Sequence, residues 1–213
     1  MRKLINNIND LIDFCRPFVS VPHETANKLQ IYADTLMKWQ KKINLVSPNT
    51  INQIWHRHMA DTAQLMSLVS HENRILDIGS GAGFPGMVLA IMGCDVTMVE
   101  VDQRKCSFLS DVAMRCGINV TIKNKSIADF WGEESGNHYS HVTARALASV
   151  SDLLEYSYPA LSSGSKCVFL KGEGVEEELT LAKQSWHIDY QVKPSLTDQR
   201  GFILMIEKAA RRD

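Results

Sequence analysis

Apolar side chains in the first third of the chain recur every three to four residues, the period of an amphipathic helix. The pattern predicts three successive helices, marked by Leu4, Ile5, Ile8, Leu11, Ile12 and Cys15, then by Leu29, Tyr32, Leu36 and Trp39, then by Ile51, Ile54, Trp55, Met59, Ala63 and Met66. We therefore expect residues 1–72 to form an N-terminal helical extension.

From residue 74 onward, short apolar runs typical of strands alternate with helical patterns. The expected strands cover residues 74–78, 96–100, 119–124, 141–144 and 166–171, and the expected helices begin at residue 85 and cover residues 104–116, 128–131, 150–158 and 176–184. Repeated βα units imply a parallel sheet covered by helices on both faces. Two final β-rich segments, 187–193 and 202–207, are separated only by a loop and predict an antiparallel hairpin at the sheet edge. Residues 73–213 are thus predicted to form a doubly wound, mostly parallel, seven-stranded α/β domain.

A glycine-rich loop directly follows the first predicted strand, in the run Asp-Ile-Gly-Ser-Gly-Ala-Gly-Phe-Pro-Gly at residues 77–86. Gly79, Gly81 and Gly83 lack a Cβ, so the chain can turn sharply with positive φ and its amides can approach a ligand closely. Pro85 fits the first turn of the following helix, where its missing N–H costs nothing. We therefore predict that the three glycines bind a nucleotide-containing cofactor.

The spacing of these glycines matches two cofactor classes. Gly81 to Gly86 fits the dinucleotide pattern G-x-G-x-x-G, whereas Gly79 to Gly83, preceded by Asp77, resembles motif I of S-adenosylmethionine-dependent methyltransferases. A carboxylate before the loop would repel a pyrophosphate but suits an ammonium and a sulfonium. Glu100, at the end of the second strand, is expected to grip ribose hydroxyls in either class. The closing hairpin favours the Rossmann-like methyltransferase fold and S-adenosylmethionine, and a nicotinamide oxidoreductase remains the less favoured alternative.

Composition limits the possible partners and compartments. The net charge of −1 and a pI near 6.7 provide no global basic field, so any nucleic acid must be bound by a local patch. The five cysteines are scattered without a C-x-x-C pair, which is typical of reduced thiols in a cytoplasmic protein. No apolar run approaches the roughly 20 residues of a membrane span, and no signal-peptide core is present. The histidines other than His58 show no metal-ligand spacing, and no metal site is predicted.

Five motifs in order give a more specific resemblance. They are Lys-Trp-Gln-Lys-Lys-Ile-Asn-Leu at 38–45, Arg-His-Met-Ala-Asp-Thr at 57–62, the glycine loop at 77–86, Ala-Arg-Ala-Leu-Ala-Ser at 144–149 and Leu-Lys-Gly at 170–172. Together they resemble the glucose-inhibited division protein B family, whose members methylate N7 of a guanosine in the 530 loop of 16S ribosomal RNA. The resemblance implies S-adenosylmethionine as cofactor and 16S ribosomal RNA within the small ribosomal subunit as partner. We further expect the chain to act as a monomer.

The resemblance also implies which residues touch the cofactor. Gly79 and Phe84 are expected to contact it from the loop, Phe84 through apolar packing. Ile127 and Ala128 would contact it after the third strand. Relatives often carry a glutamate at the position of Ala128, and because alanine lacks that carboxylate, Ala128 could contact the cofactor only through its backbone. Arg145 matches the family's cofactor-contacting arginine.

Arg145 and Lys171 end the fourth and fifth predicted strands, where open α/β sheets bind their ligands. The guanidinium of Arg145 can hold a phosphate, a guanine edge or a carboxylate. We predict that both residues are catalytic, orienting the base or its phosphate. The structural alternatives are a salt bridge over the sheet for Arg145 and a solvated strand end for Lys171. Guanine N7 already presents a lone pair, so the reaction needs alignment and not a general base.

Candidate RNA contacts come from four residues, Arg57, His58, Lys171 and Arg200. Arg57 and Asp61 stand at i and i+4 of the third helix and are predicted to be able to pair on one face. The basic run Lys38, Lys41 and Lys42, interleaved with Trp39, is compatible with phosphate contact, although such runs more often form a solvated face. A methyltransferase acting on a small molecule or a protein remains the rival function.

Overall fold

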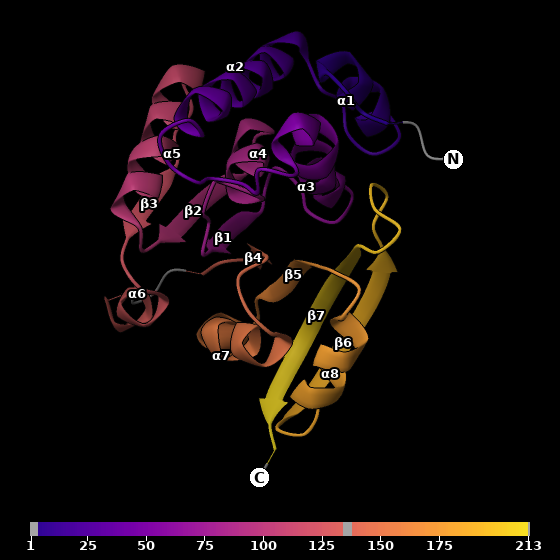
Figure 1. Cartoon of the computed structure of the whole chain (residues 1–213). Helices are drawn as coiled ribbons and strands as arrows, with labels where there is room; N and C mark the ends of the chain where they lie inside the picture. Colours follow the sequence, from indigo (N-terminus) through magenta and orange to yellow (C-terminus); the bar gives the residue numbers. More distant parts are fainter. Residues whose placement is uncertain (1–3, 134–137, 213) are drawn as a thin grey trace.

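A computed structural model of the chain describes residues 4–133 and 138–212. Seven strands form one sheet in the order β3-β2-β1-β4-β5-β7-β6 (Figure 1). Their bounds are β1 Arg74–Ile78, β2 Asp95–Glu100, β3 Thr121–Asn124, β4 His141–Arg145, β5 Lys166–Lys171, β6 Trp186–Pro194 and β7 Phe202–Arg211. The first five pair in parallel, while β7 is antiparallel to both β5 and β6. The predicted seven-stranded sheet with a closing antiparallel hairpin is confirmed.

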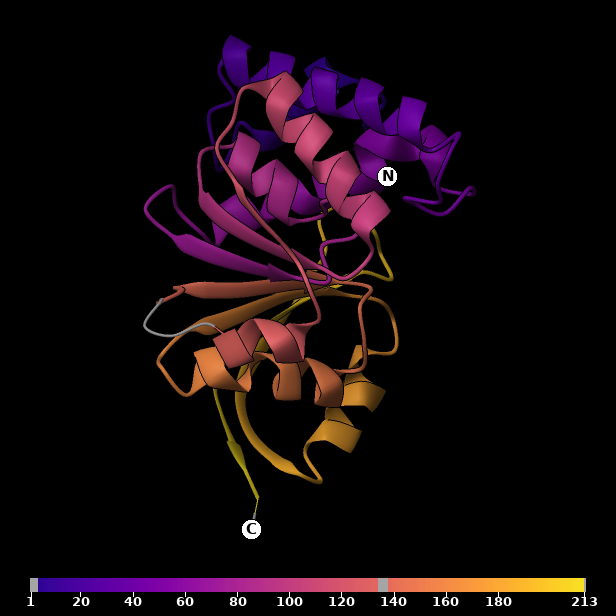
Figure 2. The ribbon, with the colours of Figure 1, turned by 90° about the vertical axis from the view of Figure 1, so that its left-hand side faces the viewer.

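Helices cover both faces of this sheet (Figure 2). One face carries α1 Ile8–Cys15, α2 His23–Trp39, α4 Gly86–Ile91 and α5 Gln103–Cys116, and the other carries α6 Ile127–Glu133, α7 Val150–Leu161 and α8 Val175–Ala182. Each side has its own apolar cluster, because the alternate residues of a strand point to opposite faces. Of the described helices, none is long and apolar enough to cross a membrane.

The N-terminal helices share a core with the sheet domain. Tyr32 and Trp39 of α2 pack on Phe108 of α5, with ring centroids 6.3 and 5.9 Å apart. Trp39 Nε1 also donates a hydrogen bond to Asp111 Oδ2 at 2.8 Å. The predicted domain boundary between residues 72 and 73 stays a prediction. The N-terminal helices and the sheet domain pack against each other continuously across it.

The third predicted helix is irregular. It consists of a 3₁₀ turn at Ile51–Gln53, a π-helical segment at Trp55–Ala60, a single α-turn at Asp61–Ala63 and a 3₁₀ turn at Gln64–Ser67. A π-helix closes i→i+5 hydrogen bonds, so residues four apart no longer lie directly above one another. The predicted pairing of Arg57 with Asp61 is wrong, since Arg57 forms an ion pair with Asp198 in the β6–β7 loop.

Candidate active site

The glycine loop between β1 and α4 has the backbone that its sequence predicts. Gly79, Gly81 and Gly83 have φ values of +63°, +54° and +87°. A Cβ at Gly79 would lie 2.4 Å from the Leu147 side chain, so this position also requires a missing side chain for packing. The Tyr32 hydroxyl of α2 donates to the Ala82 carbonyl, which ties the loop to the N-terminal helices.

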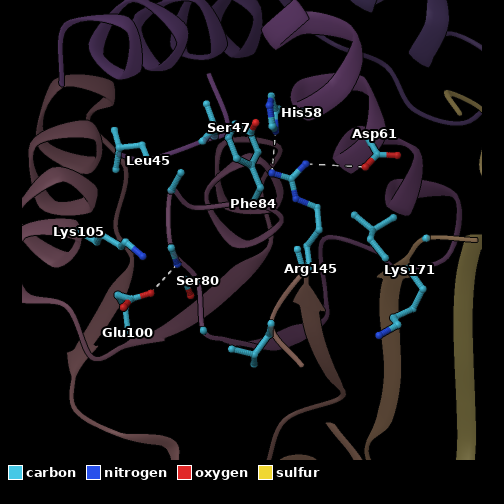
Figure 3. A pocket seen from close by; sticks show the side chains of 18 of the residues that line it. Leu45, Ser47, His58, Asp61, Ser80, Phe84, Glu100, Lys105, Arg145 and Lys171 are labelled. Atoms are coloured by element: carbon cyan, nitrogen blue, oxygen red, sulfur yellow. Dashed lines mark hydrogen bonds and ion pairs between the residues drawn. The ribbon is translucent and has the colours of Figure 1, made fainter. Parts of the chain in front are cut away.

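A cavity of about 1140 Å³ opens at the carboxyl ends of β1, β2, β4 and β5 (Figure 3). Its lining includes nearly all predicted site residues, namely Arg57, His58, Gly79, Gly81, Phe84, Glu100, Ile127, Ala128, Arg145, Lys171 and Arg200. Gly83 is not among the described lining residues, because it packs beneath the loop, where an added Cβ would lie 2.8 Å from Met87 and 2.9 Å from Leu109. The structure thus gives Gly83 a packing role, and its contact with the cofactor stays a prediction.

Glu100 lies at one end of the cavity and is held by backbone amides. Its Oε2 accepts from the Gly81 amide at 2.7 Å, and its Oε1 accepts from the Asp102 amide at 2.8 Å. These bonds fix the carboxylate at the carboxyl end of β2 while leaving lone pairs on both oxygens. The orientation suits acceptance of hydrogen bonds from a diol.

Asp77 is fully buried below the loop and is not among the described residues that line the cavity. Its Oδ1 accepts from Thr143 Oγ1 at 2.9 Å, and its Oδ2 has no hydrogen-bond partner among the described residues. Burial raises the pKa of this carboxyl to about 6, although hydrogen bonds to the carboxylate oppose the shift. The structure thus places Asp77 behind the loop, where it can act on a bound cation through its charge but not by direct contact.

Arg145 extends from the end of β4 into a cluster on the third helix (Figure 3). Its guanidinium donates to the Arg57 carbonyl at 3.2 Å and to His58 Nδ1 at 2.8 Å, and it lies 3.8 Å from Asp61 Oδ2. It also stacks over the Phe84 ring, 4.8 Å from the centroid. The salt-bridge alternative therefore describes part of the role of Arg145, which also contributes to the cavity wall.

His58 is buried, and both of its ring nitrogens have partners. Arginine can only donate, so Nδ1 must accept from Arg145, and Nε2 then carries the proton and donates to Thr50 Oγ1 at 2.9 Å. Burial and the nearby Arg145 and Arg57 cations lower the pKa of His58 to about 3. The ring is therefore neutral at physiological pH and braces Arg145, an arrangement that leaves no ring nitrogen for the predicted RNA contact.

Lys171 lines the cavity with its stem, but its ammonium is already engaged. Nζ donates to the Ala148 carbonyl at 2.9 Å and pairs with Glu178 Oε2 at 2.6 Å. The side chain is only 8% exposed, so the solvated strand end considered for this residue is wrong. Figure 3 shows the ammonium directed away from Arg145.

The β6–β7 loop supplies two cavity residues that the sequence did not reveal, Thr197 and Asp198. Asp61 Oδ1 accepts from Thr197 Oγ1 at 2.7 Å and from Ser195 Oγ at 3.2 Å, while Asp198 pairs with Arg57. The serine and threonine in a short polar loop gave no signal of this role. Ala146 was also missed, and it lines the cavity with a φ of +51°, the only positive value at a described non-glycine residue.

The sheet order, the glycine loop and the acid at the end of β2 define the fold of the S-adenosylmethionine-dependent methyltransferases. Solved structures of low sequence identity share this fold. A mutant of MtNAS in complex with S-adenosylmethionine aligns with a TM-score of 0.57 at 12% identity, covering 94% of this chain and 77% of that one. The magnesium protoporphyrin IX methyltransferase of Synechocystis aligns with a TM-score of 0.54 at 13% identity, covering 92% and 99%.

Sequence comparison identifies the family within this class. Residues 25–202 match the GidB family, described as rRNA small subunit methyltransferase G. The ribosomal RNA small subunit methyltransferase G of Paramagnetospirillum magneticum is 46% identical over 193 residues, covering 90% of this chain and 92% of that protein. The protein of the same name from Gluconobacter oxydans is 42% identical, covering 90% and 98%. The chain belongs to this family, which agrees with the resemblance found in its motifs.

Proposed function

We propose that this chain uses S-adenosylmethionine to methylate N7 of a guanosine in the 530 loop of 16S ribosomal RNA. The observation that carries the proposal is that the glycine loop, Glu100 and the Arg145 cluster all line the same cavity. The names of the relatives support ribosomal RNA of the small subunit as substrate. The N7 position and the 530 loop rest on the family resemblance of the motifs.

The cavity offers suitable partners for the ribose and the adenine of this cofactor. Glu100 would accept hydrogen bonds from the ribose hydroxyls, and Ile127 and the Ala128 backbone would flank the adenine. At Gly81 an added Cβ would find only the Gly79 carbonyl oxygen, 3.8 Å away, so the loop leaves open space there for a ligand. When bound, S-adenosylmethionine supplies an electrophilic methyl group on a sulfonium.

The chain's own residues would then align the acceptor. Guanine N7 already carries a lone pair, so no proton has to be removed before the methyl group transfers. The site matches this requirement, because His58 has no unoccupied basic nitrogen. Most of the rate acceleration would come from holding N7 in line with the methyl group. We assign this positioning role to Arg145 and the cavity wall around it.

Substrate contacts outside the cavity follow from its rim. Arg57 and Arg200 line the end of the cavity formed by the β6–β7 loop and are the proposed RNA contacts there. Lys171 would act on RNA only if the substrate displaced Glu178 from its ammonium. The net charge of −1 favours an assembled or partly assembled small subunit over free RNA as the effective substrate. A monomer working in the cytoplasm completes the proposal.

Transfer of labelled methyl from S-adenosylmethionine to small subunits that lack the modification tests the proposal. The expected product is labelled N7-methylguanosine in the small-subunit RNA. Label at another nucleotide would keep the enzyme class and discard the acceptor. No incorporation despite measurable S-adenosylmethionine binding would discard RNA methylation itself.

A further inference from the structure

A second hollow, of about 310 Å³, lies where the end of α2 meets the start of α5. Its lining residues include four basic ones, Lys41, Lys42, Arg104 and Lys105, and one acidic one, Asp102. We call this hollow the basic groove. Because the whole chain carries a net charge of −1, this concentration of cations is a local feature.

The cations of the basic groove are largely uncompensated. Asp102 is used twice at the start of α5, where Oδ1 caps the Arg104 amide at 2.8 Å and Oδ2 pairs with the Arg104 guanidinium at 3.2 Å. Lys41, Lys42 and Lys105 form no ion pair with any described residue. Unpaired ammonium groups around a hollow attract an anion from solution.

The backbone that carries Lys41 and Lys42 is held firmly. Gln40 Oε1 accepts from the amides of Leu45 and Val46 at 3.0 and 3.1 Å, and its Nε2 donates to the Val46 carbonyl at 2.9 Å. Trp39 is anchored against α5 by its bond to Asp111. The tryptophan of this basic run is thus structural, while the two exposed lysines are presented on a fixed turn.

The basic groove adjoins the active-site cavity. Lys105 lines both hollows, and Figure 3 shows its side chain reaching from α5 toward Glu100. Arg57 and Arg200 line the cavity at its β6–β7 end. Cations therefore lie on either side of the place where an acceptor base would enter. This is the arrangement needed by a strand whose phosphates continue on both sides of one inserted nucleotide.

We propose that the basic groove binds backbone phosphates of the RNA strand that flanks the methylated nucleotide. The inference rests on the proposed function, because that function supplies the strand. RNA is favoured over an acidic protein segment because the cations continue into the cavity that would take the base. Phosphate contacts of this kind position a nucleic acid without reading its sequence.

The test replaces both exposed lysines, as the double variant Lys41→Gln/Lys42→Gln. The matched control is Lys183→Gln/Lys208→Gln, which removes two exposed lysines at the C-cap of α8 and in β7. Figure 1 shows these two elements at the other end of the molecule from α2 and α5. Binding of a single-stranded RNA fragment carrying the target loop is measured over a salt series, along with KM and kcat on unmethylated small subunits. S-adenosylmethionine affinity serves as the check on folding.

The groove variant is expected to raise KM severalfold, with kcat and S-adenosylmethionine affinity unchanged. Its salt slope, log Kobs against log salt, should become less steep by about 1–2, as the loss of two phosphate contacts predicts. The control should match the wild type in both respects.

Other outcomes separate this inference from the proposed function. If the groove variant has the same salt slope and the same KM as the control, the proposal that the basic groove binds RNA is overturned. A raised KM on subunits with an unchanged slope for free RNA would also overturn it, pointing to a contact with ribosomal protein. If the wild type transferred no methyl group while the slope still fell, the groove would stand and the proposed function would fail.

Discussion

The guanidinium of Arg145 donates to Nδ1 of His58 at 2.8 Å, although the two residues lie 87 positions apart in the sequence. This bond selects the imidazole tautomer of His58, whose ring lies against Phe84 with centroids 5.1 Å apart. Burial of the ring, together with the nearby arginine cations, lowers its pKa and keeps it neutral. Arg145 and His58 therefore form one unit that shapes the cavity wall, and neither group is placed to remove a proton.

A reaction at N7 in such a site should have a flat pH profile. We expect kcat on small subunits to stay constant from pH 7 to pH 9, because no described group in the cavity must lose a proton in that range. Single-turnover rates across this window provide the measurement. A region in which log kcat rises with pH at unit slope would reveal a general base and argue against N7 as the acceptor.

The shifted pKa values of His58 and Asp77 act on stability in opposite directions. His58 titrates at about 3 in the fold against 6.5 normally, so the unfolded state binds more protons between these values and the unfolding free energy falls as pH falls. Asp77 titrates at about 6 against 3.8, so the folded state binds more protons between these values and stability rises as pH falls. Asp77→Asn removes only the second effect. When the free energy of unfolding is measured with denaturant at pH 6.5 and at pH 4, it should therefore fall more between these pH values for this variant than for the wild type. An equal fall in the two proteins would contradict the burial of a titrating Asp77.

Asp61 connects the third helix to the β6–β7 loop. Asp61→Asn weakens its bonds to Thr197 and Ser195 and removes its charge from beside Arg145. We expect a stability loss of about 1–3 kcal/mol, the range for hydrogen bonds to a charged group, together with a raised KM for subunits. Asp189→Asn, at an exposed acid on β6, is the matched control and should change neither quantity. A normal KM in the Asp61 variant would show that the loop is positioned by other contacts.

Lys171 and Glu178 form an ion pair, and removal of Lys171 leaves the Glu178 carboxylate without its cation, although the Val150 amide still donates to its Oε2 at 2.8 Å. Lys171→Met should cost roughly 2 kcal/mol, less than a fully buried pair would, because the Glu178 side chain is 30% exposed. The double variant Lys171→Met/Glu178→Leu should regain part of that loss. Methylation assays on the two variants then decide the role of Lys171. Activity that returns with stability indicates a structural pair, and activity that stays low indicates direct contact with substrate.

The loop requires glycine at position 79 for both its backbone and its neighbour. Gly79→Ala combines a φ of +63° with a Cβ 2.4 Å from Leu147. We expect a stability loss of about 1–2 kcal/mol and weaker S-adenosylmethionine binding by isothermal calorimetry. Gly132→Ala, in α6 with no atom within 4 Å of the added Cβ, is the control and should bind normally. Unchanged affinity in the Gly79 variant would mean that the loop does not contact the cofactor.

Local patterns in the sequence determined the larger part of this fold. The alternation of strands and helices, the positive φ of the loop glycines and the closing hairpin all follow from neighbouring residues, because periodicity and missing side chains act over a few positions. The cavity-lining positions of Glu100, Arg145 and Lys171 were also predictable, since ligands gather at the carboxyl ends of parallel strands.

Only the tertiary structure decided which side chains meet at the site. Arg57 pairs with Asp198 and not with the predicted partner Asp61, because the segment that contains it is π-helical and not a regular α-helix. Lys171 forms an ion pair with Glu178, and Gly83 packs beneath the loop. These outcomes depend on which residues the sheet order brings together across gaps of up to 141 positions, as between Arg57 and Asp198. Hydrophobic periodicity carries no information about such pairs, because it specifies the buried face of each element but not the partner packed against it.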